Sequence, residues 1–393
     1  MEHILWEIGH DLKIENIVRA RGCTLYDASG NTYTDLESGV WCTPLGHCHP
    51  VVNQALAGQM DAILHTGYCY AHPLIGTTAQ ALLGIAGMPA GNCLFLTSGS
   101  EAVEVGVKAI QLVSGRPKLL TFSDSFLGSL GSSGSKPEEE WYLFDRSACS
   151  RCSRPEPCEK ECAHFNAIPF STIAGFVLEP GSASGLVRFP PEKLVTAVTK
   201  KIHDTGGFVQ VNEITTGMGR TGKWFGFQHY GIRPDIVSVG KGLGNGYPVS
   251  AALFNHGISA LMKEKGFYHS QSHQNDPLGC AAALAVIQTL ETEDLIARSL
   301  EKGTWLKQAL ADLGQKHGQI KAVRGRGLMI ALDFGDDVAH PDVIRFHDTL
   351  IQKGFIVAKR PNINTFRIDP PLTVGLSVLD AFIRVLDEIL TAG

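Results

Sequence analysis

Short apolar runs alternate with longer helix-like stretches over most of this 393-residue chain. Amphipathic segments such as 101–113 and 191–205 separate several of the runs. Six runs are typical of buried strands: NCLFLT (92–97), KLLTF (118–122), AGFVLEP (174–180), GFVQVNE (207–213), DIVSVGK (235–241) and AALFN (251–255). Strand, helix and strand in this order predict an α/β fold with a mostly parallel sheet that is covered by helices on both faces.

The C-terminal part has a different pattern. A long helical region begins at Pro277 and runs to about His317. Further strand-like runs (IKAVRGRGLMIALDF, FIVAK and FRIDPP) follow, with helices near 341–353 and 376–391. This mixture is typical of a smaller α+β domain.

The strand-like pieces GCTLYDASG and NTYTDL near the start are expected to pack with this C-terminal part. We therefore expect two domains. The small domain combines residues 1–45 with residues 291–393, and the large domain spans residues 46–290. The Gly- and Ser-rich segment 128–140 is expected to be a flexible loop.

Charge and hydropathy exclude some classes of partner. The 39 acidic and 34 basic residues give a formal net charge of −5, which argues against a nucleic-acid partner because such proteins present a basic stripe. No apolar run reaches the roughly 20 residues of a membrane-spanning helix, so we expect no membrane partner. Glu2, Glu7 and Asp11 stand where a secretory signal needs a basic end and an apolar centre, which favours a cytoplasmic location.

Lys241 directly follows a predicted strand and precedes three glycines, Gly242, Gly244 and Gly246. Ligands of open α/β sheets bind at the carboxyl ends of the strands. A partly desolvated lysine has a lowered pKa and forms Schiff bases with aldehydes. The spacing alone is equally compatible with a glycine-rich turn that carries a solvated lysine.

Two further segments have the form of ligand sites. In LTSGSEAVEVGVKAI (96–110) a strand leads through a Ser-Gly-Ser turn into a helix, where backbone N–H groups and the Ser100 hydroxyl suit a phosphate. An ordinary helix N-cap with Glu101 in the first turn explains the same residues more simply. In 208–231 a strand leads into a glycine-bearing loop, and a polar residue at its tip faces either a cofactor or its own loop.

Taken together, SGSEAVE (98–104), the segment 212–251 and DPLGCAAALAV (276–286) resemble the class III pyridoxal-phosphate-dependent aminotransferases. The resemblance extends from GCTLYDASGNTYTDLESGV and LGHCHP near the start to RGRGLMIALDF and FRIDPPLT near the end. It implies the fold type I architecture, in which a mostly parallel seven-stranded sheet forms the large domain and a small α+β domain accompanies it.

The resemblance also implies roles for residues around the cofactor. Lys241 would hold pyridoxal 5'-phosphate as a Schiff base and would then carry the proton that leaves the substrate's α-carbon. Gly99 and Ser100 would hold the phosphate. Phe126, in FSDSFLGS, would stack on the pyridine ring, as aromatic faces do.

Three more residues are implied at the subunit boundary and in the substrate pocket. Ser272 stands where the family has a threonine that reaches the phosphate of the neighbouring subunit, which implies a homodimer with shared active sites. Arg367 in FRIDPPL matches an arginine that grips the substrate carboxylate, a task suited to a guanidinium. Trp41 in SGVWC either lines the substrate pocket or belongs to the core.

Asn212 is the main departure from the family pattern. The family's strand usually ends Asp-Glu, and its aspartate hydrogen-bonds the pyridine nitrogen; here the strand ends VNE. A carboxylate keeps that nitrogen protonated so that the ring withdraws electrons, and a neutral amide cannot supply this charge. Altered chemistry, a slow enzyme and an engineered substitution are all open explanations.

Other positions depart as well. Thr215 stands where the family has a glutamine near the cofactor's phenolic oxygen, and Leu127 stands where it has a histidine. The ornithine and 4-aminobutyrate branches carry a glutamate that pairs with the carboxylate-binding arginine, whereas Ser184 occupies that place here. The resemblance therefore implies that Arg367 is permanently free for a carboxylate, which disfavours the acetylornithine and ornithine branches.

A cysteine cluster has no counterpart in the family pattern. Four of the ten cysteines follow the spacing C-x2-C-x5-C-x3-C: Cys149, Cys152, Cys158 and Cys162. Four thiolates from a short polar loop suit tetrahedral zinc, and an iron–sulfur cluster is the second candidate. His164 is a possible substitute ligand, and the alternative to a metal site is a set of reduced surface thiols.

The sequence thus predicts an aminotransferase that moves an amino group from an amino acid or ω-amino acid to a 2-oxo acid. Another pyridoxal-phosphate reaction on the same fold, racemisation, epimerisation or an intramolecular amino shift, is the alternative. Asn212 favours that alternative because racemisation demands less protonation of the cofactor. A non-catalytic, metal-bearing homologue is a third possibility.

Overall fold

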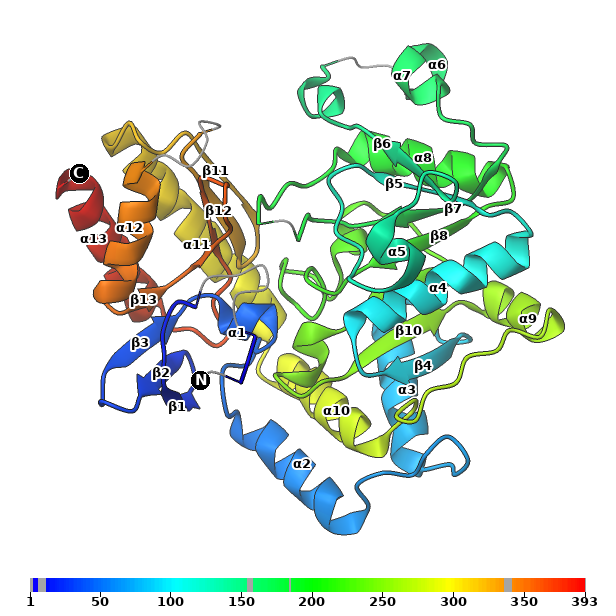
Figure 1. Cartoon of the computed structure of the whole chain (residues 1–393), viewed down its shortest axis with the longest axis horizontal. Helices are drawn as coiled ribbons and strands as arrows, with labels where there is room; N and C mark the ends of the chain where they lie inside the picture. Colours follow the sequence, from blue (N-terminus) through cyan, green and yellow to red (C-terminus); the bar gives the residue numbers. More distant parts are fainter. Residues whose placement is uncertain (1–2, 6–11, 154–157, 184, 336–340, 393) are drawn as a thin grey trace.

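A computed structural model describes residues 3–5, 12–153, 158–183, 185–335 and 341–392. Three sheets organise these residues. A larger part of the molecule is built on a seven-stranded sheet, and a smaller part beside it contains two four-stranded sheets (Figure 1).

The large sheet has the strand order β4-β10-β9-β8-β7-β5-β6. Its strands are β4 (Asn92–Leu96), β5 (Lys118–Phe122), β6 (Trp141–Phe144), β7 (Ile173–Leu178), β8 (Phe208–Asn212), β9 (Ile236–Val239) and β10 (Ser250–Phe254). Only β10 is antiparallel to its neighbours among these strands, so the mostly parallel sheet is confirmed. All six predicted strands are present, and β6 is an addition that the sequence analysis missed.

Helices cover both faces of this sheet. Residues of β7 pack on both sides of the sheet: Ala174 and Val177 join a cluster with α4 (Gly99–Ser114), whereas Phe176 and Leu178 join the cluster that contains α8 (Glu192–Asp204). Every residue of β7 is buried. Burial on both faces explains why the strands read as continuous apolar runs instead of alternating patterns.

The smaller part joins the two ends of the chain. Its sheets are β1-β2-β3-β13 and β11-β12-β15-β14. Thr34 pairs in parallel register with Phe355, which connects the first strands to the C-terminal region. The strands are β1 (Ile17–Arg21), β2 (Thr24–Asp27), β3 (Thr32–Asp35), β11 (Ala322–Arg326), β12 (Met329–Asp333), β13 (Phe355–Ile356), β14 (Ala358–Lys359) and β15 (Thr365–Ile368). The domain boundaries at residues 45 and 290 stay predictions.

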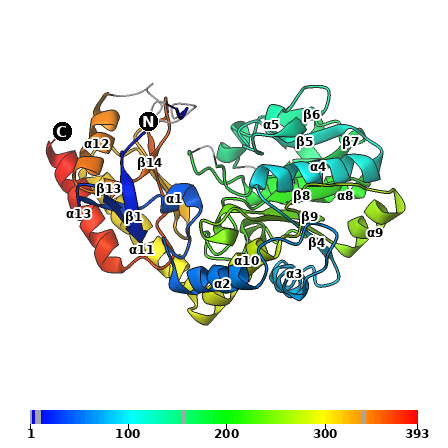
Figure 2. The same ribbon diagram turned by 60° about the horizontal axis from the view of Figure 1, so that its bottom comes forward.

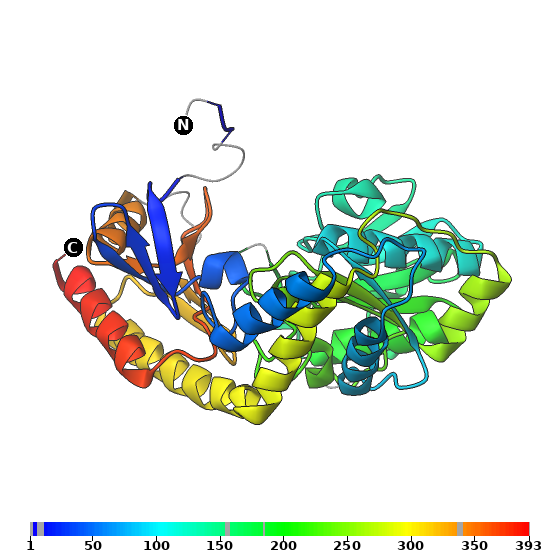
Figure 3. The same ribbon diagram turned by 90° about the horizontal axis from the view of Figure 1, so that it is seen from below.

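The long helical region from Pro277 is two helices. Helix α10 (Pro277–Thr292) ends before Asp294, whose φ of 48° is left-handed, and α11 (Leu295–Lys316) continues in a new direction. Both are coloured yellow in Figure 3, where they run along the underside from the larger part to the smaller one. Figure 2 places α11, α12 (Pro341–Gln352) and α13 (Leu376–Ala392) together on the side of the small sheets.

The segment 128–140 is not the flexible loop that its composition predicts. It contains the short helix α5 (Gly131–Ser135), and the backbone N–H groups of Ser132 and Ser133 donate to the carboxylate of Glu104 on α4. The Trp141 indole N–H donates to the Ser132 hydroxyl at 2.8 Å. A buried carboxylate thus orders a segment that has few apolar residues of its own.

The remaining helices are short or lie at the edge of the sheet. They are α1 (Ser38–Trp41), α2 (Pro50–Ala62), α3 (Pro73–Ile85), α6 (Cys158–Glu161), α7 (Ala163–Asn166) and α9 (His256–Glu264), with 3-10 turns η1 (Ala148–Arg151), η2 (Gly226–His229) and η3 (Lys241–Gly244). Within the described part of the chain, we find no helix with the length and apolar character needed to cross a membrane.

Candidate active site

Segments that leave one edge of the seven-stranded sheet enclose a cavity of about 110 Å³. Strands β4, β5, β7, β8 and β9 run in the same direction, so their carboxyl ends meet there. The lining residues are Gly99, Ser100, Val103, Phe126, Leu127, Gly128, Glu179, Ala183, Asn212, Ile214, Thr215 and Lys241. This is the edge at which open α/β sheets bind their ligands.

Lys241 lies two residues beyond β9 and begins η3 with a left-handed φ of 45°. Burial lowers the pKa of its ammonium group, and the positive charge of Arg367 lowers it further, while Cys42 and Glu179 oppose the shift. A lowered pKa increases the fraction of neutral amine near pH 7, and the neutral amine is the form that attacks an aldehyde.

The start of α4 forms one wall of the cavity. Ser98 caps this helix, and the Glu101 carboxylate accepts hydrogen bonds from the Thr97 and Ser98 backbone N–H groups. A Cβ atom at Gly99 would lie 2.8 Å from the side chain of Ile214, so only glycine leaves this cradle open. Backbone N–H groups at the start of a sixteen-residue helix suit a phosphate, and Ser100 places its hydroxyl beside them.

Asn212 ends β8 and is 5% exposed. Its side-chain NH₂ donates to the backbone carbonyl of Phe126 at 3.1 Å, and its side-chain oxygen accepts the backbone N–H of Ile214 at 3.2 Å. The Phe126 ring is 46% exposed at the cavity. The amide, the aromatic ring, Thr215 and the α4 cradle are therefore gathered around Lys241, and this arrangement fits a phosphorylated aromatic aldehyde.

Glu179 is a cavity residue that the sequence analysis did not single out. It follows β7 and accepts the backbone N–H groups of Phe126 at 3.1 Å and Ala183 at 2.9 Å. Burial raises the pKa of this carboxyl to about 7, although the two hydrogen bonds act against the shift. Its position in the sequence could have indicated this site, because Glu179 is a polar residue directly after a buried strand, as Asn212 is a polar residue at the end of β8.

Arg367 on β15 is not free. Its side chain is fully buried, and its Nε and Nη2 atoms donate to the two carboxylate oxygens of Asp369 at 2.6 and 3.2 Å. The expectation of an arginine permanently available to a substrate carboxylate is therefore wrong, because a carboxylate of the same chain already occupies two of its donors. Ser184, the position from which that expectation came, lies outside the described residues.

Trp41 covers Arg367. The guanidinium carbon of Arg367 lies 3.8 Å from the centroid of the Trp41 ring, and Nζ of Lys241 lies 5.0 Å from the same centroid. Trp41 is 5% exposed. The ring is therefore packed like a core residue and adjoins Lys241 at the same time.

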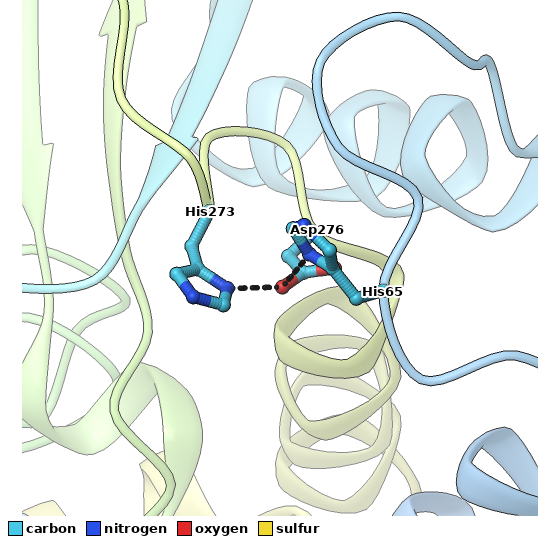
Figure 4. Close-up of side chains that lie close together, drawn as sticks. All are labelled: His65, His273 and Asp276. Atoms are coloured by element: carbon cyan, nitrogen blue, oxygen red, sulfur yellow. Dashed lines mark hydrogen bonds and ion pairs between the residues drawn. The ribbon is translucent and has the colours of Figure 1, made fainter.

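Ser272 is exposed and lies apart from the described residues that line the cavity with Lys241. The loop that carries Ser272 is held next to the start of α10 by contacts to Asp276. The Nδ1 atoms of His65 and His273 lie 3.0 and 2.9 Å from the same oxygen of Asp276 (Figure 4). Within the described part of the chain, these three residues form the one group whose possible metal-ligating atoms all lie within 4.8 Å of each other.

The four clustered cysteines lie around the gap at 154–157, and three of them are partly buried. Burial raises the pKa of Cys149 to about 11, and the charges of the other three thiolates add to the shift. Among the residues that the structure describes, these cysteines do not form a group with ligand atoms within 4.8 Å. His164 instead contacts the backbone carbonyl of Asp145 through Nε2 at 2.6 Å, so metal binding at this loop stays a prediction.

A lysine of lowered pKa, a helix start that suits phosphate and an aromatic ring thus meet at one sheet edge, an arrangement that suits a phosphorylated aldehyde cofactor. The chain belongs to the class III aminotransferase family, whose model matches residues 9–390. It has the fold type I architecture and is a pyridoxal-phosphate-dependent enzyme of amino-group transfer.

Individual relatives agree with this membership. The chain is 31% identical to the acetylornithine aminotransferase of Methanosarcina mazei over 94% of its own length and 90% of the relative's. It is also 31% identical to that of Bacillus subtilis, over 91% and 90%. A crystal structure of an amine transaminase from an uncultivated Pseudomonas species, in a form with bound pyridoxal phosphate, superposes with a TM-score of 0.89 at 26% identity, covering 99% and 98%.

Proposed function

We propose that amino transfer in this protein runs through Lys241, with an amino acid or ω-amino acid as donor and a 2-oxo acid as acceptor. Bound pyridoxal phosphate would supply the aldehyde that reacts with amines and the ring that takes up electrons from the substrate. The observation that carries the proposal is the meeting of Lys241, the Gly99–Ser100 cradle and Asn212 at one sheet edge.

Each cavity residue has a task in this proposal. Lys241 would hold the aldehyde carbon of the cofactor until the substrate amine displaces it, and the freed amine of Lys241 would then accept the proton that leaves the substrate's α-carbon. Gly99 and Ser100 hold the phosphate at the start of α4, and Phe126 packs against the ring. Asn212 would offer an N–H to the ring nitrogen, and Thr215 lines the same cavity.

A second reaction, racemisation or an amino shift within one substrate, is favoured by one observation. Asn212 is a neutral amide and is held between Phe126 and Ile214. Because it cannot keep the ring nitrogen protonated by its charge, reactions that need a weaker electron sink are less impaired than transamination.

Absorbance spectroscopy of the cofactor-loaded enzyme separates these reactions. Donors would include acetylornithine, after which several relatives are named, together with α-amino acids and ω-amino acids. Conversion of the lysine-bound cofactor to its amine form supports transamination, and it should be absent in Lys241→Ala. Loss of α-carbon deuterium without that conversion supports racemisation. No spectral response to any donor contradicts both and supports a non-catalytic homologue.

We further propose a homodimer in which Ser272 reaches the phosphate of the partner subunit, an assignment supported by its exposure away from its own cavity. Mixing Lys241→Ala with Ser272→Ala subunits tests it: hybrid dimers then hold one site with both defects and one site with neither. Activity should reappear on mixing. Mass measurement in solution should give twice the chain mass, and a monomer would contradict the assignment.

A cytoplasmic location is proposed on the state of the cysteines. All ten are free thiols, and a reducing compartment preserves such thiols. Cell fractionation with a tagged full chain tests this, and recovery in a membrane or secreted fraction would contradict it.

Zinc at Cys149, Cys152, Cys158 and Cys162 is a separate proposal, which rests on their spacing in the sequence. Purified protein should contain about one equivalent of metal for a four-cysteine site. Cobalt substitution should give intense thiolate-to-metal absorption, which Cys152→Ser should abolish. Cys69→Ser, at an exposed cysteine elsewhere, is the matched control. Well under one equivalent would contradict the site, and an iron–sulfur spectrum would replace zinc.

A further inference from the structure

Asp369 is rigidly held by the elements around it. Its backbone N–H donates to the carbonyl of Leu36 at 2.8 Å, and its own carbonyl accepts the Ser38 hydroxyl at 2.5 Å. Its side chain is fully buried, as is that of Arg367. The two-pronged contact between Asp369 and Arg367 is therefore part of the folded core and cannot be broken by a simple side-chain rotation toward solvent.

A second buried arginine, Arg220, lies near this pair, and the carboxylates of Asp369 and Asp35 both act on its charge. Arg220 is 3% exposed, and its Nη1 donates to the carbonyls of Leu328 and Pro370. Burial lowers the pKa of Arg220 to about 10, and the nearby Asp369 carboxylate opposes the shift. Asp369 thus faces two buried guanidinium groups, and removing its charge would leave both cations less compensated.

Asp369 occupies one side of the Arg367 guanidinium. Nε and Nη2 are bonded to Asp369, and Nη1 has no hydrogen-bond partner among the described residues. The Trp41 ring covers the face of the guanidinium at 3.8 Å. An incoming carboxylate is therefore left only the end of the guanidinium formed by Nη1 and the second N–H of Nη2, and it meets a cation whose charge Asp369 already offsets.

We propose that Asp369 determines the substrate class of this enzyme, by pairing with Arg367 through Nε and Nη2 and offsetting its charge, which weakens recognition of a carboxylate beside the reacting amine. Amino donors with an alkyl group in that position, or with a distant carboxylate, are accepted nearly as well as α-amino acids. This inference rests on the proposed function of Lys241 and concerns the choice of donor.

The wild-type enzyme provides the first test, because alanine and 2-aminopropane differ only by a carboxylate in place of a methyl group. A site built to bond a substrate group rejects an analogue that lacks it by about 10⁴-fold. With Arg367 already paired, we expect kcat/KM for alanine to exceed that for 2-aminopropane by no more than roughly 10²-fold. A ratio near 10⁴ overturns the proposal and points to another cation, such as Arg360, which lies 5.4 Å from the Trp41 centroid.

Asp369→Asn provides the second test. The amide keeps an acceptor for Arg367 but removes the charge that repels the substrate, so the ratio of alanine to 2-aminopropane should rise by about tenfold or more. Asp369→Glu, which retains the charge, should leave the ratio within about threefold of wild type. Asp333→Asn is the matched control. Asp333 on β12 pairs with Arg324 on the adjacent strand β11 and lies outside the cavity. An unchanged ratio in Asp369→Asn overturns the proposal.

A binding measurement keeps the result independent of turnover and of a variant that fails to fold. Calorimetry with the cofactor-loaded protein should detect propanoate binding at least about tenfold more tightly in Asp369→Asn than in wild type. If Asp369→Asn does not fold, the wild-type ratio decides. If no donor reacts in any variant, the proposed function has failed, and propanoate affinity still decides the role of Asp369.

Discussion

The guanidinium carbon of Arg367 lies 3.8 Å from the centroid of the Trp41 ring, and Nζ of Lys241 lies 5.0 Å from the same centroid. Cations near an indole face are attracted by its negative quadrupole. Trp41 ends a turn in which Ser38, Gly39, Val40 and Trp41 all have left-handed φ values between 51° and 69°. Such backbone is unfavourable for residues other than glycine, and strain of this kind concentrates at functional sites.

Replacing Trp41 with alanine should therefore destabilise the protein. Loss of a large buried aromatic side chain lowers the free energy of unfolding by about 3–5 kcal/mol. Trp41→Phe retains a ring and should lose markedly less. Urea unfolding of both variants gives the comparison, and equal stability of wild type and Trp41→Ala would show that the ring is not packed as described.

Asn212→Asp should accelerate transamination. A carboxylate at the end of β8 would stabilise a protonated ring nitrogen by a charge-assisted hydrogen bond, which corresponds to roughly a ten- to hundredfold increase in kcat. Single-turnover absorbance measures the step directly. Asn212→Ala, which removes both the donor and the acceptor, should be slower than wild type. An aspartate variant no faster than wild type would mean that this residue does not face the ring nitrogen.

Stability should fall as the pH rises toward 8. Burial raises the pKa of Glu179 and of Glu213 to about 7, above the ordinary glutamate value of 4.5. Between pH 4.5 and 7 the folded state binds more protons than the unfolded state. The stabilisation that each protonated carboxyl contributes is therefore complete below pH 4.5 and is lost as the pH passes 7. Each of the two groups changes the free energy of unfolding by up to about 3 kcal/mol over this pH range.

Urea unfolding of the cofactor-free protein at pH 5 and pH 8 checks this dependence. Glu179→Gln should reduce the loss of stability between the two pH values, since the amide does not ionise. Glu192→Gln, at an exposed position in α8, should leave it unchanged. A wild-type protein that is equally stable at both values would contradict the raised pKa values.

Gly303 and Gly58 should respond in opposite ways to alanine. Both lie inside helices, α11 and α2, but a Cβ atom at Gly303 would lie 2.0 Å from the carbonyl oxygen of Gly327. Gly303→Ala should therefore lower the free energy of unfolding by about 1–3 kcal/mol. Nothing described lies within 4 Å of a Cβ at Gly58, so Gly58→Ala should raise it by about 0.5–1 kcal/mol.

Thermal or urea unfolding of the two variants side by side is the measurement. Stabilisation by Gly303→Ala would mean that α11 and the turn at Gly327 are not in close contact.

Much of the fold was predictable because its signals are local. The strands of the large sheet are buried on both faces, so they read as apolar runs. Lys241 and Asn212 follow two of these runs directly. The strand β6 was missed because it is four residues long and follows a polar Gly- and Ser-rich segment, whose order depends on Glu104 of another helix.

The pairing of Arg367 with Asp369 also had a local signal. Residues two apart on an extended chain lie on the same face, so an opposite charge at that spacing is within reach of the arginine. The family pattern instead pointed to Ser184, which is distant in the sequence, and so the partner Asp369 was missed.

The sequence by itself determined the sheet, the lysine after β9 and the helix start that faces it, because each follows from the periodicity and residue types of one segment. Only the tertiary structure decided that Trp41 covers Arg367 and that Ser38 bonds the backbone of Asp369, 331 residues away. The physical reason is that the partners and the solvation of a charged group depend on what the folded chain brings within a few ångströms of it.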